Sequence, residues 1–196
     1  MPTDRRDLHR ALFRTASAQG GYFTAAQAKD VGYSYQAQAY HVRAGNWVRI
    51  DRGLFRLMSW SPAVHDDLIR WTLWSREQAV VSHETALGVL EIGELESPRI
   101  HLTVPDGFPK SDPAIALHRA ILPESDVVQR NGFKATSVMR SLIDVAGSAD
   151  EDQLARAIED GRDRGLFTLR QLRELAEATD LQAALRIERA LQAPAT

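Results

Sequence analysis

Residues Thr24 to Trp60 read TAAQAKDVGYSYQAQAYHVRAGNWVRIDRGLFRLMSW, and this stretch decides the fold of the first third of the chain. The hydroxyl of Thr24 can accept a hydrogen bond from a free amide of a first helical turn, and residues 25–31 are mostly strong helix formers. Gly32 can adopt the left-handed conformation that ends a helix. The sequence therefore predicts a short helix between Thr24 and Gly32.

A second helix is expected directly after the first. Ser34 is a favourable N-cap for a helix from Tyr35 to Ala44, and Gly45 marks its end. Two short helices joined by a tight, glycine-containing turn are typical of a helix-turn-helix. The second helix is therefore the candidate recognition helix.

Two strand-forming runs follow, on either side of a turn at Arg52-Gly53. Aromatic and β-branched residues favour strands, and they are frequent in residues 47–51 and 54–57. A basic hairpin placed after two helices gives the element order of a winged helix. Pro62 and a change in the sign of the charge mark the expected boundary, so we expect residues 1–60 to form a DNA-binding domain and residues 61–196 a second domain.

Charge is divided unevenly between these two parts. The 196 residues carry a formal net charge of −2, yet residues 1–60 contain nine Lys or Arg against four Asp or Glu, a net +5, which leaves −7 for residues 61–196. A basic first part favours binding to a polyanion such as DNA. The overall composition, 44% hydrophobic and 26% charged, is that of an ordinary globular protein.

Several classes of protein are disfavoured by the composition. No apolar run reaches the roughly 18 residues of a membrane-spanning helix. The N-terminus is charged from Asp4 onward and lacks the apolar centre of a signal peptide. The absence of cysteine excludes disulfides and thiolate metal sites, and no glycine-rich phosphate loop is present. We therefore expect a cytoplasmic protein without a membrane partner or a nucleotide cofactor.

The helical period predicts which side chains would face DNA. Ala39 and Val42 suit the buried side of the recognition helix, with Tyr35 or Gln38 one turn before them. The opposite side would then be presented to DNA, together with the start of the helix and the basic wing. The expected DNA-contacting residues are Ser34, Tyr35, Gln36, Tyr40, Arg43, Arg49 and Arg52.

Each of these residue types has a known way of contacting DNA. Gln36 can pair with adenine and Arg43 with guanine in the major groove, and Tyr40 can contact phosphate or a thymine methyl group. Arg52 at the wing tip can enter a minor groove or contact phosphates, or it can serve as a charged hairpin edge that prevents aggregation. The phase of the helix is open by one position, because His41 could be buried instead of Tyr40.

The rest of the chain predicts an α+β architecture, with a C-terminal domain of several helices around a small, mostly antiparallel sheet. Asn131-Gly132 is a strong hairpin turn signal between its last two strands. Strands are expected over residues 99–104, 114–119, 126–130 and 133–136. Helices are expected over residues 4–18, 63–78, 82–90, 136–146, 150–164, 168–178 and 180–191, with a loose tail over residues 193–196.

Three polar residues of the second domain, His83, Glu84 and Asp144, are candidates for catalysis. Catalysis would need a nucleophile with an oxyanion site, or a metal with further ligands, and the sequence shows neither. Asp144 follows Arg140 by four residues, which favours an ion pair on a helix surface. We therefore expect no catalytic residue, no metal ligand and no cofactor.

The segment GYSYQAQAYHVRAGNWVRIDRGLFRL, residues 32–57, resembles the N-terminal winged helix of the AbiEi-type antitoxins of type IV toxin–antitoxin systems. In that family a capped recognition helix leads through a glycine and an aromatic residue or leucine to an Arg-Gly wing that ends in an aromatic residue and leucine. The matching positions are Gly45, Trp47, Arg49, Arg52, Gly53, Phe55 and Leu57.

The resemblance continues beyond this segment. Ser82-His83 and Ala86 match a recurring SH-x-x-A stretch, and a strand ends in Val104-Pro105. Residues 136–146 match a Thr-Ser pair that leads through arginine to a Leu-(Leu/Ile)-Asp-Leu-Ala string, with valine here in place of the last leucine.

The resemblance implies an antitoxin whose winged helix binds operator DNA and represses its own operon. Its second domain would counter the effect of a nucleotidyltransferase-like toxin, either with or without forming a stable complex with it. Some relatives continue into an endonuclease-like domain, but the paired acidic-plus-lysine motif of such a domain is absent here, which argues against nuclease activity. The alternative is a stand-alone winged-helix transcriptional regulator with a ligand- or protein-sensing second domain.

Overall fold

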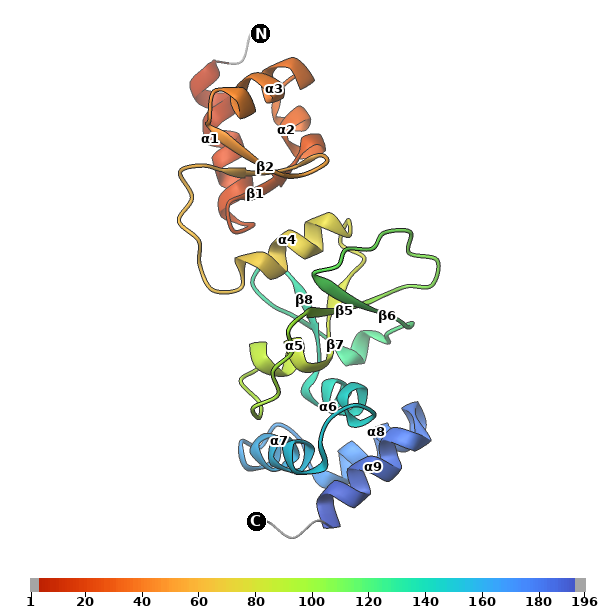
Figure 1. Ribbon diagram of the computed structural model, residues 1–196. Helices are drawn as coiled ribbons and strands as arrows, with labels where there is room; N and C mark the ends of the chain where they lie inside the picture. Colours follow the sequence, from red (N-terminus) through yellow and green to blue (C-terminus); the bar gives the residue numbers. More distant parts are fainter. Residues whose placement is uncertain (1–3, 193–196) are drawn as a thin grey trace. The chain divides into compact units, whose positions relative to one another are not determined.

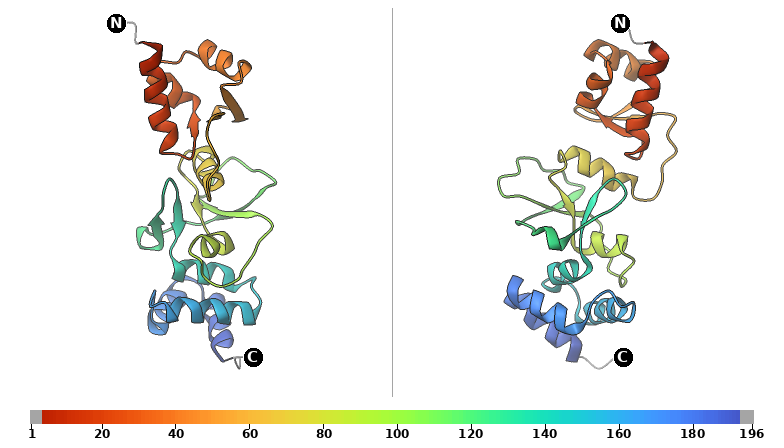
Figure 2. Two further views of the ribbon diagram at one scale, coloured as in Figure 1. Left: turned by 90° about the vertical axis from the view of Figure 1, so that its left-hand side faces the viewer. Right: turned by 180° about the vertical axis from the view of Figure 1, so that it is seen from behind.

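The computed structural model describes residues 4–192, and within them the chain forms two compact units (Figures 1 and 2). Unit 1 reaches to Gln78 and includes Asn131–Phe133, and unit 2 consists of Ala79–Arg130 and the chain from Lys134 onward. The domain boundary expected after residue 60 stays a prediction. The expected loose tail over residues 193–196 lies outside the described residues.

Unit 1 combines helices with a three-stranded antiparallel sheet of strand order β1-β3-β2. The expected helix-turn-helix and its basic hairpin are both present, which confirms a winged helix-turn-helix within an α+β protein. The elements in chain order are α1 (Arg5–Ser17), β1 (Tyr22–Thr24), α2 (Ala25–Val31), α3 (Tyr35–Arg43), β2 (Trp47–Asp51), β3 (Leu54–Leu57) and α4 (Asp66–Trp74).

The ends of α2 and α3 follow from the capping residues of the sequence. Thr24 Oγ1 accepts a hydrogen bond from the amide of Gln27 at 3.1 Å, and Gln27 Oε1 accepts one from the amide of Thr24 at 2.8 Å, which completes a capping box. Gly32 ends α2 with a φ angle of 118°. Ser34 Oγ accepts from the amide of Ala37 at 3.2 Å and so starts α3.

An aromatic cluster centred on Trp47 joins the helices of unit 1 to its sheet. The Trp47 ring lies edge-on to Phe23 at 4.8 Å and to Tyr33 at 5.1 Å between ring centroids, and its face stacks on His41 at 4.7 Å. Such edge-to-face pairs add to the free energy gained from apolar burial. Because His41 lies on α3 and Phe23 on β1, the cluster fixes α3 against the sheet.

The rotation of α3 about its own axis is set by a buried amide. Gln38 is 3% exposed, and its Nε2 donates to the carbonyl oxygens of Ala25 at 3.0 Å and Tyr33 at 3.1 Å. Gln38, and not Tyr35, is therefore the inward-facing residue one turn before Val42. The expectation that Ala39 faces the core is wrong, because orienting Gln38 inward leaves Ala39 exposed.

The wing is attached to the start of α2. The amide of Ala25 donates to the carbonyl oxygen of Gly53 at 2.8 Å, next to the turn of the hairpin. Gly53 has a φ angle of 74°, a conformation that favours glycine. The β2–β3 register shifts between Arg49 and Asp51, as in a β-bulge, which increases the local twist of the hairpin.

The helix expected over residues 63–78 is shorter at both ends. Asp66 Oδ2 accepts hydrogen bonds from the amide of Ala63 at 2.8 Å and from Nε1 of Trp60 at 3.0 Å, so the chain before Asp66 forms a turn. At the other end, Arg76 and Glu77 have positive φ angles of 58° and 64°, which a helix cannot contain.

Unit 2 is built on a five-stranded sheet of order β6-β5-β4-β8-β7. The β4–β5 and β7–β8 pairs are antiparallel, and the β4–β8 and β5–β6 pairs are parallel. The fifth strand, β4, was not expected because its two residues carry no readable alternation. The elements are β4 (Val80–Val81), α5 (His83–Val89), β5 (Ile100–Val104), β6 (Ile115–Arg119), η1 (Glu124–Asp126), β7 (Val127–Gln129), β8 (Lys134–Thr136), α6 (Val138–Ala146), α7 (Glu151–Asp163), α8 (Leu169–Thr179) and α9 (Leu181–Gln192).

Helix α6 is the centre of the apolar core of unit 2. It packs against α5, α7, α8 and α9, and the helices α6 to α9 gather on one side of the sheet (Figures 1 and 2). Leu142, Val145 and Ala146 on α6 are fully buried in this core, together with Leu154 and Leu172. No helix within residues 4–192 has both the length and the apolar character needed to cross a membrane.

One arginine of α6 forms a buried ion-pair network. Arg140 Nε donates to Asp144 Oδ1 at 2.8 Å, and Arg140 Nη1 donates to Asp126 Oδ2 at 3.0 Å. The expected pair between Arg140 and Asp144 is present, but it does not lie on a helix surface, because both side chains are about 10% exposed. The second carboxylate, from η1, lets the guanidinium tie α6 to the β7 side of the sheet.

We predict that Gln38→Met destabilises unit 1. Methionine keeps the length of the side chain but removes the donor to two carbonyl oxygens, which costs about 1–3 kcal/mol. All four tryptophans of the chain lie in unit 1, so urea unfolding followed by tryptophan fluorescence reports on this unit. The measurement is the shift of the unfolding midpoint to lower urea.

The matched control for this variant is Gln36→Met, the same substitution two residues earlier on the exposed side of α3. Its free energy of unfolding should stay within about 0.5 kcal/mol of the parent chain. Equal midpoints for the two variants would contradict a role for Gln38 in holding α3.

Candidate nucleic-acid interface

The side of α3 opposite Gln38 carries three exposed polar side chains. At about 100° per residue, Gln36, Tyr40 and Arg43 lie within an arc of about 60° on this side. All three are exposed, and Tyr40 is 60% exposed. The structure therefore brings together on one helix face the three residues that the sequence assigned to base and phosphate contacts.

Tyr40 and His41 have opposite environments, which resolves the phase of the helix. His41 is partly buried, and it stacks on Trp47 and lies edge-on to Tyr33. Burial, together with the nearby His9 and Arg5, lowers the pKa of His41. Because the His41 ring packs on Trp47 and Tyr40 is exposed, Tyr40 is the outward-facing residue.

The start of α3 adds further polar groups to the same surface. Ser34 and Tyr35 are both exposed, and Tyr35 is 65% exposed. Ser34 Oγ uses a lone pair to cap the helix, so its hydroxyl proton remains available for a donor contact. Lys29 Nζ lies 5.6 Å from the centroid of the Tyr35 ring, because the tight turn at Gly32 brings the end of α2 beside the start of α3. Lys29 is a further cation of this surface, and it was not among the residues expected to contact DNA.

The wing presents two of its three arginines. Arg49 and Arg52 are exposed, and the backbone amide of Arg52 donates to Asp51 Oδ1 at 2.6 Å beside the turn. Arg56 is only partly exposed, and its guanidinium lies over the Tyr22 ring at 5.8 Å. The two arginines assigned to DNA from the sequence are thus accessible, whereas Arg56 packs against the sheet.

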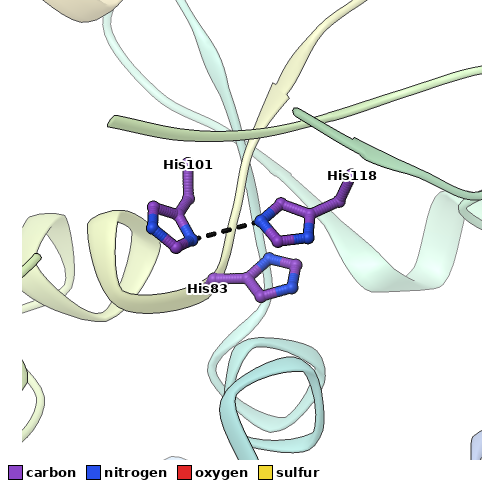
Figure 3. A group of neighbouring side chains, drawn as sticks. All are labelled: His83, His101 and His118. Carbon is purple, nitrogen blue, oxygen red and sulfur yellow. Dashed lines mark hydrogen bonds between the residues drawn. The ribbon is translucent and has the colours of Figure 1, made fainter. Parts of the chain in front are cut away.

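Unit 2 contains a cluster of three histidines, of which only His83 was expected to be of interest from the sequence. His83 begins α5, His101 lies on β5 and His118 on β6, and Figure 3 shows the three rings pointing toward one another. One ring nitrogen from each lies within 4.8 Å of the other two. His101 Nδ1 is 3.2 Å from His118 Nε2, and the rings of His83 and His118 stack at 3.5 Å.

Carboxylates surround these histidines. Glu84 Oε2 lies 3.0 Å from His101 Nδ1, and Asp144 Oδ2 lies 3.9 Å from His83 Nδ1. Hence the residues considered for catalysis, His83, Glu84 and Asp144, do belong to one cluster. Among the described side chains, Asp144 Oδ2 is buried without a hydrogen-bond partner.

Burial controls the protonation of this cluster. It is the main cause that lowers the pKa of His83 to about 3, with His118 and His101 adding to the effect. It also lowers the pKa of His118, again with a contribution from His101. The hydrogen bond with His101 lowers the pKa of Glu84, and burial raises the pKa of Asp144. Near neutral pH, His83 and His118 are therefore neutral imidazoles.

The register of β5 and β6 explains why this cluster could not be read from the sequence. The two strands are parallel, and His101 pairs with Ala116 while Thr103 pairs with His118. Residues two apart on a strand share a face, so both histidines lie on the same side of the sheet, where His83 meets them. The sequence singled out His83, Glu84 and Asp144, but it gave no sign that His101 and His118 lie beside them, because that depends on the β5–β6 register.

Comparisons with known proteins bear on both units. Residues 10–57 match the family model of the AbiEi antitoxin transcriptional regulators. The fold of the whole chain is similar to the crystal structure of the RV2827C protein from Mycobacterium tuberculosis, with a TM-score of 0.61 and 14% identity over 96% of this chain and 77% of that one. The comparison with curated proteins gave no match.

The matched residues include α2, α3 and both strands of the wing, and every residue assigned to DNA contact lies within residues 10–57. At 14% identity, the structural similarity shows the fold alone. Residues 10–57, which form the winged helix-turn-helix, are thus similar to the AbiEi antitoxin family of transcriptional regulators.

Proposed function

We propose that this chain is a type IV antitoxin that binds operator DNA, represses its own operon and neutralises a nucleotidyltransferase-like toxin through its C-terminal domain. The observation that carries the DNA-binding part is the exposed face of α3 formed by Gln36, Tyr40 and Arg43, opposite the buried Gln38. The antitoxin part is supported by the family of residues 10–57.

Helix α3 enters the major groove in this proposal. Gln36 makes paired hydrogen bonds to adenine, and Arg43 makes paired hydrogen bonds to guanine. Tyr40 contacts a phosphate or packs on a thymine methyl group, and Ser34 and Tyr35 hold the backbone at the start of the helix. The small, exposed Ala39 beside this face lets α3 approach the base edges closely.

The wing supplies much of the affinity and little of the sequence preference. Arg49 and Arg52 contact phosphates or the adjacent minor groove, which releases condensed counterions. The net charge of +5 on residues 1–60 attracts DNA before these contacts form. A single winged helix covers a short site, so the operator is expected to contain repeated half-sites.

The toxin is countered without enzymatic chemistry in this proposal. Members of the matched family are regulators and antitoxins, not a class of enzyme. The C-terminal domain would act on the toxin, or on its effect, through its surface.

We predict that Arg52→Ala and Gln36→Ala weaken DNA binding in different ways. Loss of one phosphate contact should lower the affinity for all sequences and reduce the slope of log affinity against log salt by about 0.9. Loss of the adenine contact should cost about 1–3 kcal/mol on the operator, with little effect on unrelated DNA. The measurement is fluorescence anisotropy with the chain's own promoter fragment and with a scrambled fragment, at several salt concentrations.

Matched controls come from unit 2. Arg170→Ala removes the same charge and Gln182→Ala the same amide from exposed helix positions. Both should leave the affinity and the salt slope unchanged. If Arg52→Ala and Gln36→Ala behave like these controls, the assignment of α3 and the wing to DNA is incorrect.

We further predict that the two activities separate in the full chain. The triple variant Arg43→Ala, Arg49→Ala, Arg52→Ala should lose operator binding and repression, because three cationic contacts are removed while the core of unit 1 is untouched. It should still restore growth when co-expressed with the toxin encoded beside it. The readouts are promoter-reporter activity and colony counts.

Failure of the parent chain itself to restore growth, with repression intact, would favour a stand-alone regulator whose second domain senses a ligand or a protein. Loss of rescue only in the triple variant would show instead that neutralisation requires DNA binding.

A further inference from the structure

We propose that unit 2 contains a binding site for a divalent transition-metal ion, best suited to Zn²⁺, formed by His83, His101, His118 and the carboxylate of Glu84. This inference is independent of the proposed antitoxin function. It rests on the arrangement of these four side chains in the described part of unit 2 (Figure 3).

The spacing of the donor atoms fits tetrahedral coordination. With metal–ligand bonds of about 2.0–2.1 Å, neighbouring donor atoms of a tetrahedral zinc site are separated by about 3.3 Å. His101 Nδ1 lies 3.2 Å from His118 Nε2 and 3.0 Å from Glu84 Oε2. The ligand atoms of all three histidines lie within 4.8 Å of one another, and the ring of His83 stacks on that of His118 at 3.5 Å between centroids. Metal binding therefore requires the His83 ring to turn out of this stack, so that its nitrogen points at the same ion.

The donor types favour a late transition metal over Mg²⁺ or Ca²⁺. Three imidazole nitrogens and one carboxylate oxygen suit Zn²⁺ and its neighbours, whereas Mg²⁺ and Ca²⁺ prefer oxygen ligands throughout. A metal ion would also explain why so many acceptors meet here. Glu84 Oε2 and Asp144 Oδ2 are both buried polar atoms. A metal ion would place a positive charge next to them, with Glu84 as a ligand and Asp144 as a close neighbour.

Groups outside the ligand set hold the rings in place. Ser97 Oγ lies 2.9 Å from Nε2 of His101, the nitrogen that points away from the cluster. Ser82 Oγ lies 2.9 Å from His83 Nδ1 and accepts a hydrogen bond from Thr103 Oγ1 at 2.8 Å. Such contacts to ligand histidines are a regular part of zinc sites, because they fix ring orientation.

The position of the site in the fold gives the metal a structural consequence. Strand β6 is at the edge of the sheet and pairs only with β5 among the described strands. A metal held by His118 on β6, His101 on β5 and His83 on α5 would tether this edge strand to the strand and the helix behind it. Binding should therefore slow hydrogen exchange in β6.

The test uses Co²⁺ and Zn²⁺ added to the metal-free full chain. Co²⁺ reports tetrahedral coordination by its visible absorption, and the absence of cysteine removes thiolate bands from that spectrum. We expect one Co²⁺ per chain, its displacement by Zn²⁺, and slower amide exchange in β6 on metal binding. His101→Gln and His118→Gln should each weaken metal binding by more than about 100-fold, beyond the 10- to 100-fold typical of an outer contact.

The control is His9→Gln, which changes an exposed histidine of unit 1 and should bind metal as the parent does. Far-UV circular dichroism verifies that each variant is folded. If a histidine variant does not fold, Glu84→Gln provides another variant of a ligand residue. Absence of stoichiometric binding to the parent chain, an octahedral Co²⁺ spectrum, or equal affinities in the ligand variants and His9→Gln would overturn the proposal.

Discussion

The buried amide of Gln38 is the constraint on which the presentation of the recognition helix depends. Its Nε2 donates hydrogen bonds to two backbone carbonyl oxygens, that of Ala25 at the start of α2 and that of Tyr33 in the turn before α3. An unsatisfied amide in this position would be costly, so α3 cannot rotate without losing both bonds. The same amide therefore stabilises the packing of α2 on α3 and decides that Gln36, Tyr40 and Arg43 point outward. A polar core residue thus determines which side chains of α3 are presented on the surface of unit 1.

The two units use charge in contrasting ways. In unit 1 the arginines assigned to DNA on α3 and the hairpin are exposed, so water solvates their charges and they are accessible to a polyanion. In unit 2 the charges that matter are buried: Arg140 is held between Asp126 and Asp144, and the histidine cluster lies beside Asp144. A buried cation with two anionic partners stabilises a specific packing arrangement, and buried imidazoles stay neutral. The first arrangement suits reversible binding to DNA, and the second suits a fixed internal site.

Local signals predicted most of the elements. Thr24, Ser34, Asp150 and Thr168 act as N-caps because a cap involves only neighbouring residues. The less accurate predictions concern features with distant partners. The helix expected over residues 63–78 begins only at Asp66, because the Asp66 carboxylate bonds to Trp60 and Ala63. The two residues of strand β4 form a strand because they pair with β5 on one side and β8 on the other.

The sequence by itself determined the winged helix-turn-helix, the α+β class and the basic character of the first third, because caps, turns and alternation act over a few residues. It also indicated which side chains of α3 and the wing are candidates for DNA. Only the tertiary structure decided the phase of α3, through Gln38, and the meeting of His83, His101 and His118. The physical reason is that helix rotation and strand register depend on contacts between residues far apart in the chain, and no local pattern encodes them.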